Sequence, residues 1–171
     1  MDMPSVLVVM GVSGSGKTTV AALLAGRLGW ELGDADDWHS PANVRKMHGG
    51  TPLTDDDRWP WLASIAAWID ATRSTGRHAI LACSALKRAY RDVLIGNRSD
   101  VRLVYLRGEE SLIHTRQAAR LNHYMPASLV RSQFEALETP GPDERPLIAD
   151  VDAPAHDIVD AIMAQLPGAP V

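Results

Sequence analysis

The sequence has 171 residues, of which 46% are hydrophobic, and its formal net charge is −4. This length provides one domain with a substantial core, and the composition excludes a disordered chain or a membrane-spanning one. The single cysteine, Cys83, excludes an internal disulfide and a multi-cysteine zinc site. The acidic balance, without a Lys/Arg block or a secretory signal, predicts a cytoplasmic protein that binds neither nucleic acid nor membrane.

Apolar runs and capping signals divide the chain into strands that alternate with helices. Strands are expected at residues 5–10, 30–34, 78–83, 101–106 and 147–151. Helices are expected at residues 18–28, 86–95, 109–119, 126–137 and 155–166, with two more that begin after Ser40 and after Thr54. This alternation is typical of an α/β fold with a parallel sheet and helices on both faces. No linker interrupts it, so residues 1–171 are expected to form a single domain.

A glycine-rich loop lies between the first predicted strand and the first predicted helix. Its sequence fits G-x-x-x-x-G-K-[ST], in the structural context that this phosphate-binding motif requires. Backbone N–H groups of such a loop converge on phosphate oxygens, and the helix N-terminus adds partial positive charge. Lys17 is expected to reach the β- and γ-phosphates, and the Thr18 hydroxyl is expected to bind Mg²⁺. The predicted nucleotide site comprises Gly11, Val12, Ser13, Gly14, Ser15, Gly16, Lys17 and Thr18.

Other segments distinguish between the classes of protein that use this loop. The sequence Asn-Arg-Ser-Asp at 97–100 only superficially resembles the base-reading motif of a GTPase, since it precedes a strand and has arginine at its second position. The strand at 78–83 is followed by Ser84-Ala-Leu-Lys87, where an ATPase motor would have a magnesium-binding aspartate. The remaining class is a small-molecule phosphotransferase.

Two aspartates follow the second predicted strand, beside the phosphate loop in this architecture. Ligands bind at the carboxyl ends of strands in open α/β sheets. Asp34 and Asp36 lie two residues apart on a segment that is expected to be extended. We therefore expect Asp34 to hold Mg²⁺ through water, and Asp36 to orient and deprotonate the acceptor hydroxyl.

Cationic side chains near these carboxylates predict an anionic acceptor. His39 follows on the same loop, and Ser84 and Lys87 follow another strand at the same edge of the sheet. A lysine at a helix start opposes the helix dipole, which indicates that Lys87 has an anionic partner. Arg58 either forms an ion pair with a nearby aspartate on its own helix or binds the acceptor, and the sequence leaves both readings open.

Arg116 and Arg120 lie four residues apart, on one face of a predicted helix. Like charges at this spacing repel each other in an isolated helix. Binding to phosphate, from a lid that excludes water, accounts for the pair. The alternative is that they pair with Glu109, Glu110 or Asp143.

Several segments together resemble the small P-loop gluconate kinases. The matching segments are residues 11–18, 34–39, 43–58, 83–92, 132–135 and 143–145. The resemblance implies the fold of nucleoside-monophosphate kinases, with a five-stranded parallel sheet, a lid near residues 116–126 and an acceptor-binding region near residues 36–60. It also implies that a homodimer phosphorylates D-gluconate to 6-phospho-D-gluconate with ATP and Mg²⁺.

The resemblance also implies roles for individual residues. Lys17, Asp36 and Arg120 would be catalytic, and the acceptor would bind to Asp36, His39, Arg58, Ser84, Lys87 and His123. Two other functions stay open at this stage. One is a kinase of the same fold for shikimate or another sugar acid. The other is a non-catalytic module that binds ATP as a regulatory ligand.

Overall fold

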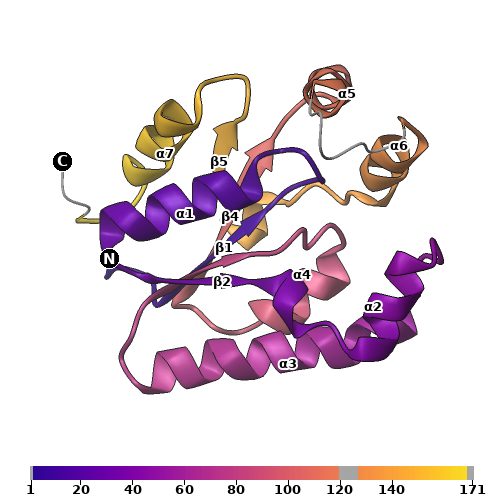
Figure 1. Ribbon diagram of the computed structural model, residues 1–171. Coiled ribbons are helices and arrows are strands. Elements are labelled where there is room, and N and C mark those ends of the chain that lie inside the picture. Colours follow the sequence, from indigo (N-terminus) through magenta and orange to yellow (C-terminus); the bar gives the residue numbers. More distant parts are fainter. Residues whose placement is uncertain (1, 120–126, 169–171) are drawn as a thin grey trace.

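A computed structural model describes residues 2–119 and 127–168, without the side chains of residues 127 and 128 (Figure 1). Five parallel strands form one sheet in the order β2-β3-β1-β4-β5, which confirms the predicted parallel α/β fold. The strands are β1 (Val6–Met10), β2 (Glu31–Asp34), β3 (Ala79–Ala82), β4 (Val101–Arg107) and β5 (Leu147–Asp150). The helices are α1 (Lys17–Leu28), α2 (Pro41–His48), α3 (Asp55–Ser74), α4 (Arg88–Leu94), α5 (Glu110–Ala118), α6 (Ala127–Ala136) and α7 (Ala155–Met163).

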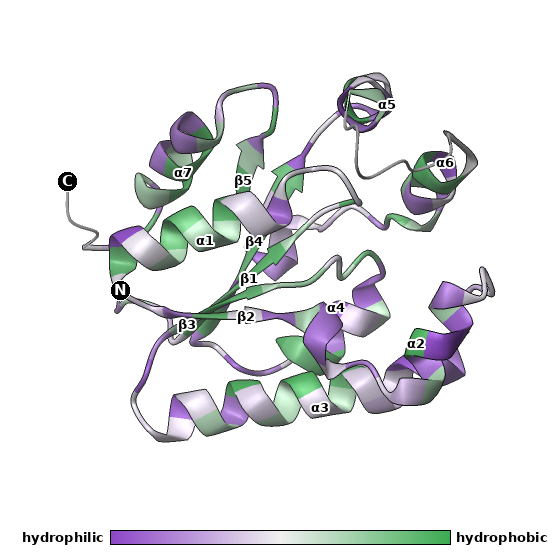
Figure 2. Ribbon diagram, viewed as in Figure 1, coloured by the Kyte–Doolittle hydropathy of each residue, from purple (hydrophilic) through white to green (hydrophobic). Residues whose placement is uncertain are grey.

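The core consists of two apolar layers, one on each face of the sheet. Figure 1 shows α1 and α7 on one side of the strands and α3 on the other. Leu24 of α1 and Ile162 of α7 pack in the first layer, and Ile65 of α3 and Leu94 of α4 pack in the second. All five residues of β1 are buried because both faces are covered. Figure 2 shows the resulting pattern, with the hydrophobic residues concentrated on the strands between the helices. Among the described residues, no helix is long and apolar enough to cross a membrane.

The helix starts predicted after Ser40 and after Thr54 are confirmed. Ser40 caps α2 by accepting a hydrogen bond from the Asn43 amide, with Pro41 in the first turn. Thr54 and Asp57 form a reciprocal capping box at the start of α3.

The extended conformation expected through Asp36 is wrong. Residues Ala35–Trp38 form a short 3₁₀ helix, η1, directly after β2. The Asp34 carboxylate causes this turn, because its Oδ1 accepts a hydrogen bond from the Asp36 amide at 3.0 Å. A second short 3₁₀ helix, η2, forms at Pro142–Glu144.

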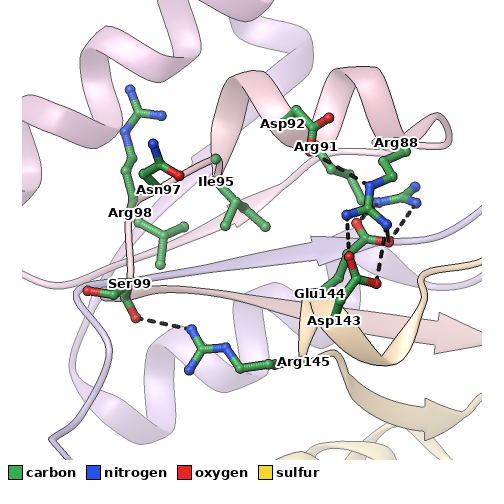
Figure 3. A pocket seen from close by; sticks show the side chains of 12 residues that line it. Arg88, Arg91, Asp92, Ile95, Asn97, Arg98, Ser99, Asp143, Glu144 and Arg145 are labelled. Carbon is green, nitrogen blue, oxygen red and sulfur yellow. Dashed lines mark hydrogen bonds and ion pairs between the residues drawn. The ribbon is translucent and has the colours of Figure 1, made fainter.

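A buried arginine ties together the segments beyond α4. The Arg91 guanidinium is almost fully buried, binds the Glu144 carboxylate at 2.6 Å and donates to the carbonyls of Ala85, Leu86 and Glu138. It therefore fixes the turn after β3 relative to the chain that leaves α6. The same ion pair borders a cavity of about 260 Å³, shown in Figure 3 together with the neighbouring residues Arg88, Asp143 and Arg145.

Candidate functional site

The phosphate loop has the backbone conformation that anion binding requires. Gly14 and Gly16 have φ angles of +86° and +94°, a left-handed region that disfavours other residues. A Cβ atom on Gly14 would lie 2.3 Å from the Gln117 side chain, so this position also has no room for one. Gly16 precedes α1, and the loop amides therefore adjoin the positive end of that helix.

Lys17 and Ser15 supply polar groups inside this loop. The Lys17 ammonium group donates to the carbonyls of Gly11 and Val12, at 3.0 and 3.1 Å. Burial lowers the pKa of Lys17, while the charges of Asp36 and Asp34 act in the opposite direction. The Ser15 hydroxyl is buried and has no hydrogen-bond partner among the described atoms. A phosphate group would satisfy that hydroxyl and the buried ammonium, so the residues present fit a nucleotide.

A cavity of about 340 Å³ lies beside the loop. Its lining includes Gly16 and Val20 at the start of α1, Ala153 and Ile158 near α7, and Arg116 of α5. The Arg116 guanidinium donates to the carbonyl of Val151.

Two of the three alternative partners named for Arg116, Glu110 and Asp143, have other contacts. Glu110 lies 3.5 Å from His114, and Asp143 pairs with Arg88. Arg116 lines the cavity beside the phosphate loop, and its role in phosphate binding stays a prediction. Its expected companion, Arg120, lies outside the described residues, as does His123.

The two aspartates after β2 lie close to the loop lysine. Partial burial raises the pKa of Asp36, although the residue is exposed, and the charge of neighbouring Asp34 raises it further, whereas His39 and Lys17 lower it. A carboxyl group with a raised pKa is a better proton acceptor than an ordinary aspartate.

Thr18 is exposed near the start of α1. The described residues include no cluster of three or more His, Cys, Asp or Glu that could hold a metal ion. A magnesium ion here would need phosphate oxygens as additional ligands.

His39 contacts side chains of two helices, α2 and α3. Its ring stacks on Trp61 of α3, with the centroids 4.2 Å apart and an interplanar angle of 11°. Its Nδ1 lies 3.5 Å from the Asn43 side-chain amide. Burial lowers the pKa of His39, Asp36 raises it and Arg58 lowers it again. The ring is therefore neutral near pH 7 and can exchange hydrogen bonds with hydroxyl groups.

The acceptor-side cations converge on one carboxylate that was not among the predicted site residues. The Lys87 ammonium lies 3.3 Å from Asp55, which is the anionic partner that the helix position predicted. Arg58 lies 3.9 Å from the same carboxylate and donates to the Leu53 carbonyl at 2.9 Å. The Tyr90 hydroxyl also donates to Asp55. Both cations thus contact Asp55 and lie 5.7 and 5.6 Å from the centroid of the Tyr90 ring, and the ion pair that was one of the two readings for Arg58 is present.

Ser84 and the phosphate loop are in direct backbone contact. The Ser84 carbonyl accepts a hydrogen bond from the Gly11 amide at 3.3 Å. The loop after β3 is thereby joined to the nucleotide loop, which places Lys87 and Lys17 at the same end of the sheet.

A further contact to the loop comes from α6. The Gln133 side-chain oxygen accepts hydrogen bonds from the Ser13 amide at 3.2 Å and from the Ser13 hydroxyl at 3.4 Å. The only sequence signal for this residue was its presence in the matching segment 132–135.

Comparisons with known proteins show the family of this chain. The AAA domain family matches residues 6–139. A probable gluconokinase from Mus musculus is 44% identical over 97% of this chain and 100% of its own length. A gluconokinase from Gluconobacter oxydans is 50% identical over 82% of this chain and 79% of its own. The crystal structure of a gluconokinase from Sinorhizobium meliloti has a TM-score of 0.86 and 42% identity, covering 96% of this chain and 92% of that one.

Proposed function

The chain belongs to the gluconokinase family of P-loop kinases, and from that premise we propose that it phosphorylates D-gluconate with ATP. The products would be 6-phospho-D-gluconate and ADP. The observation on which we base the proposal is that Arg58 and Lys87 meet at Asp55, at the sheet edge that also carries the phosphate loop, where an acceptor carboxylate would take the place of Asp55. The two cations would bind an acceptor that carries a carboxylate, next to the triphosphate of the nucleotide.

The nucleotide would bind with its phosphates in the loop. Lys17 and the loop amides would hold the β- and γ-phosphates, and Arg116 would line the pocket beside them. Mg²⁺ would bind the Thr18 hydroxyl and, through water, Asp34. When bound, it would neutralise charge on the phosphate oxygens. The buried Ser15 hydroxyl supports this assignment because it lacks a partner among the described atoms.

The acceptor would lie between η1, α3 and the start of α4. Arg58 and Lys87 would bind its carboxylate, with His39, Ser84 and His123 contacting its hydroxyl groups. Asp36 would orient the terminal hydroxyl and accept its proton as the oxygen attacks the γ-phosphorus in line with the departing ADP oxygen. The raised pKa of Asp36 supports this role.

Arg120 would stabilise the charge on the transferring group together with Lys17. We further propose that residues 1–171 act as a single kinase domain, with a lid near residues 116–126 and an acceptor region near residues 36–60. We also propose that the protein is a cytoplasmic homodimer and that it binds neither nucleic acid nor membranes.

Product identification tests this function. Phosphorus NMR of a reaction containing ATP, Mg²⁺ and D-gluconate should show one phosphate ester, on the terminal carbon, formed in equal amount to ADP. An ester on another acceptor only, such as shikimate, would retain the phosphotransferase and reject gluconate. Binding of ATP without any ester would favour the regulatory module.

A further inference from the structure

Gln133 has a position in the site that the proposed mechanism does not yet use. It lies on α6, 120 residues from its contact in the phosphate loop. Its side-chain oxygen binds both the amide and the hydroxyl of Ser13. A carboxamide therefore lies directly against the loop whose amides are expected to hold phosphate.

The hydrogen bonds of Ser13 fix the orientation of this carboxamide. A backbone N–H can only donate, so the atom of Gln133 that faces it is the oxygen, Oε1. The Nε2 group, with its two N–H donors, is then on the other branch of the same planar group. Ser13 thus holds a neutral hydrogen-bond donor in a fixed place beside the loop.

Ser13 directly follows the two loop residues that contact Lys17. The Lys17 ammonium lies on the carbonyls of Gly11 and Val12, the two residues that precede Ser13. In P-loop proteins this lysine reaches the β- and γ-phosphates. Ser13 and Gln133 therefore adjoin the end of the loop that receives the terminal phosphates.

We propose that Gln133 is a catalytic residue whose Nε2 group donates a hydrogen bond to the transferring γ-phosphoryl group. The inference rests on the proposed function insofar as ATP is the phosphoryl donor. In the reaction, the bond between the γ-phosphorus and the ADP oxygen breaks, a bond to the acceptor oxygen forms, and the hydroxyl proton goes to Asp36. Gln133 gives up no proton. It stabilises the charge that develops on the equatorial oxygens.

Two substitutions separate this role from a purely structural one. Gln133→Glu keeps the side-chain length and the oxygen that accepts from Ser13, but replaces the donor with a charged oxygen. Gln133→Met keeps the length and removes both polar groups. We expect both variants to lose about 10- to 100-fold in kcat, with the glutamate variant no more active than the methionine variant. Glu135→Gln, an exposed change on the same helix, is the matched control.

The outcomes decide between the roles. If Gln133→Glu is as active as the wild type while Gln133→Met is impaired, the residue only ties α6 to the loop. Full activity of Gln133→Met would also overturn the proposal, whatever the glutamate variant does. Thermal unfolding of each variant shows whether a loss of kcat has instead come from a loss of the fold.

Calorimetric titration with ATP and with ADP makes the test independent of the acceptor. Because the donor faces the γ-phosphate, both variants should weaken ATP binding more than ADP binding. If the wild type binds ATP but does not phosphorylate gluconate, the proposed function fails while this contrast still tests Gln133. Equal weakening of ATP and ADP would overturn the inference and leave the proposed function intact.

Discussion

The indole N–H of Trp61 donates a 2.7 Å hydrogen bond to the carbonyl of Ala35, the residue between Asp34 and Asp36. Both Trp61 and Ala35 are buried, and the same indole stacks on His39. One side chain of α3 thus fixes the backbone that carries both carboxylates and the imidazole. The positions of Asp36 and His39 therefore depend on this contact between α3 and η1.

Replacing this indole should therefore affect catalysis as well as stability. Trp61→Phe leaves the buried Ala35 carbonyl without its partner, which should cost about 1–3 kcal/mol of the free energy of unfolding. Because η1 loses its anchor, kcat should fall while the KM for ATP stays within about twofold of the wild type. Denaturant unfolding and steady-state kinetics measure the two effects.

Trp30→Phe is the control for this substitution. Trp30 stacks on His78, with the ring centroids 4.7 Å apart, next to the amino ends of β2 and β3. Its replacement should change stability without changing kcat. Equal kinetic effects of the two substitutions would contradict the role of the Trp61 contact.

Asp36→Asn tests the proton-acceptor role. The amide has nearly the shape of the carboxyl group but cannot take the hydroxyl proton. We expect kcat to fall by about 100-fold or more, with little change in ATP affinity. Steady-state kinetics with both substrates varied separates the two quantities. Comparable losses in turnover and in ATP affinity would instead indicate that Asp36 serves the metal.

The capping box of α3 should make stability depend on acid pH. The Lys46 ammonium, 2.9 Å from Asp57, and the Thr54 amide hold the pKa of Asp57 at about 2. A carboxyl whose pKa is lower in the folded state stabilises the fold above its unfolded pKa of about 3.9, and this contribution disappears as the pH falls toward 2.

The melting temperatures of wild type and Asp57→Asn measure this contribution. Their difference should be constant above about pH 5 and should shrink between about pH 4 and pH 2. Asp56→Asn, at the neighbouring position in the same turn, is the control. A difference that is the same at all these pH values would show that Asp57 acts without its charge.

Removing the buried arginine should be strongly destabilising. Arg91→Met leaves the Glu144 carboxylate, which is 10% exposed, with only the 3.9 Å contact to Arg88, and the loss of one member of a buried pair costs about 3–5 kcal/mol. Arg88→Met removes an exposed cation from Asp143 and should cost about 0–1 kcal/mol. Urea unfolding of the two variants should therefore differ clearly. Similar midpoints would mean that Arg91 does not hold these segments together.

Much of the fold could be predicted because its signals are local. The apolar run of β1, the Ser40-Pro41 start of α2 and the Thr54 cap of α3 each lie within a few neighbouring residues. The phosphate loop is a continuous motif, and its surroundings match the prediction. The 3₁₀ turn after Asp34 also has a local cause, the hydrogen bond from the Asp36 amide to the Asp34 carboxylate. It was missed because two acidic residues directly after a strand were interpreted as a continuation of the extended chain.

Contacts between distant segments could not be predicted. Tyr90 reaches Asp55 across 35 residues, and Gln133 reaches Ser13 across 120. Nothing in the spacing of the chain encodes these pairs, since the order of the strands and the packing of α4 and α6 bring them together. Arg91 is a similar case, because a charged residue on a short helix is usually exposed.

The release of ADP with a panel of acceptors tests the central claim most directly. The reactions contain ATP, Mg²⁺ and one of D-gluconate, related aldonic acids, glucose, shikimate or AMP. We predict strong release with D-gluconate, little with neutral glucose, and none with AMP, because Arg58 and Lys87 bind a carboxylate. Release with a different acid and not with gluconate, or no release that depends on any acceptor, would contradict the account.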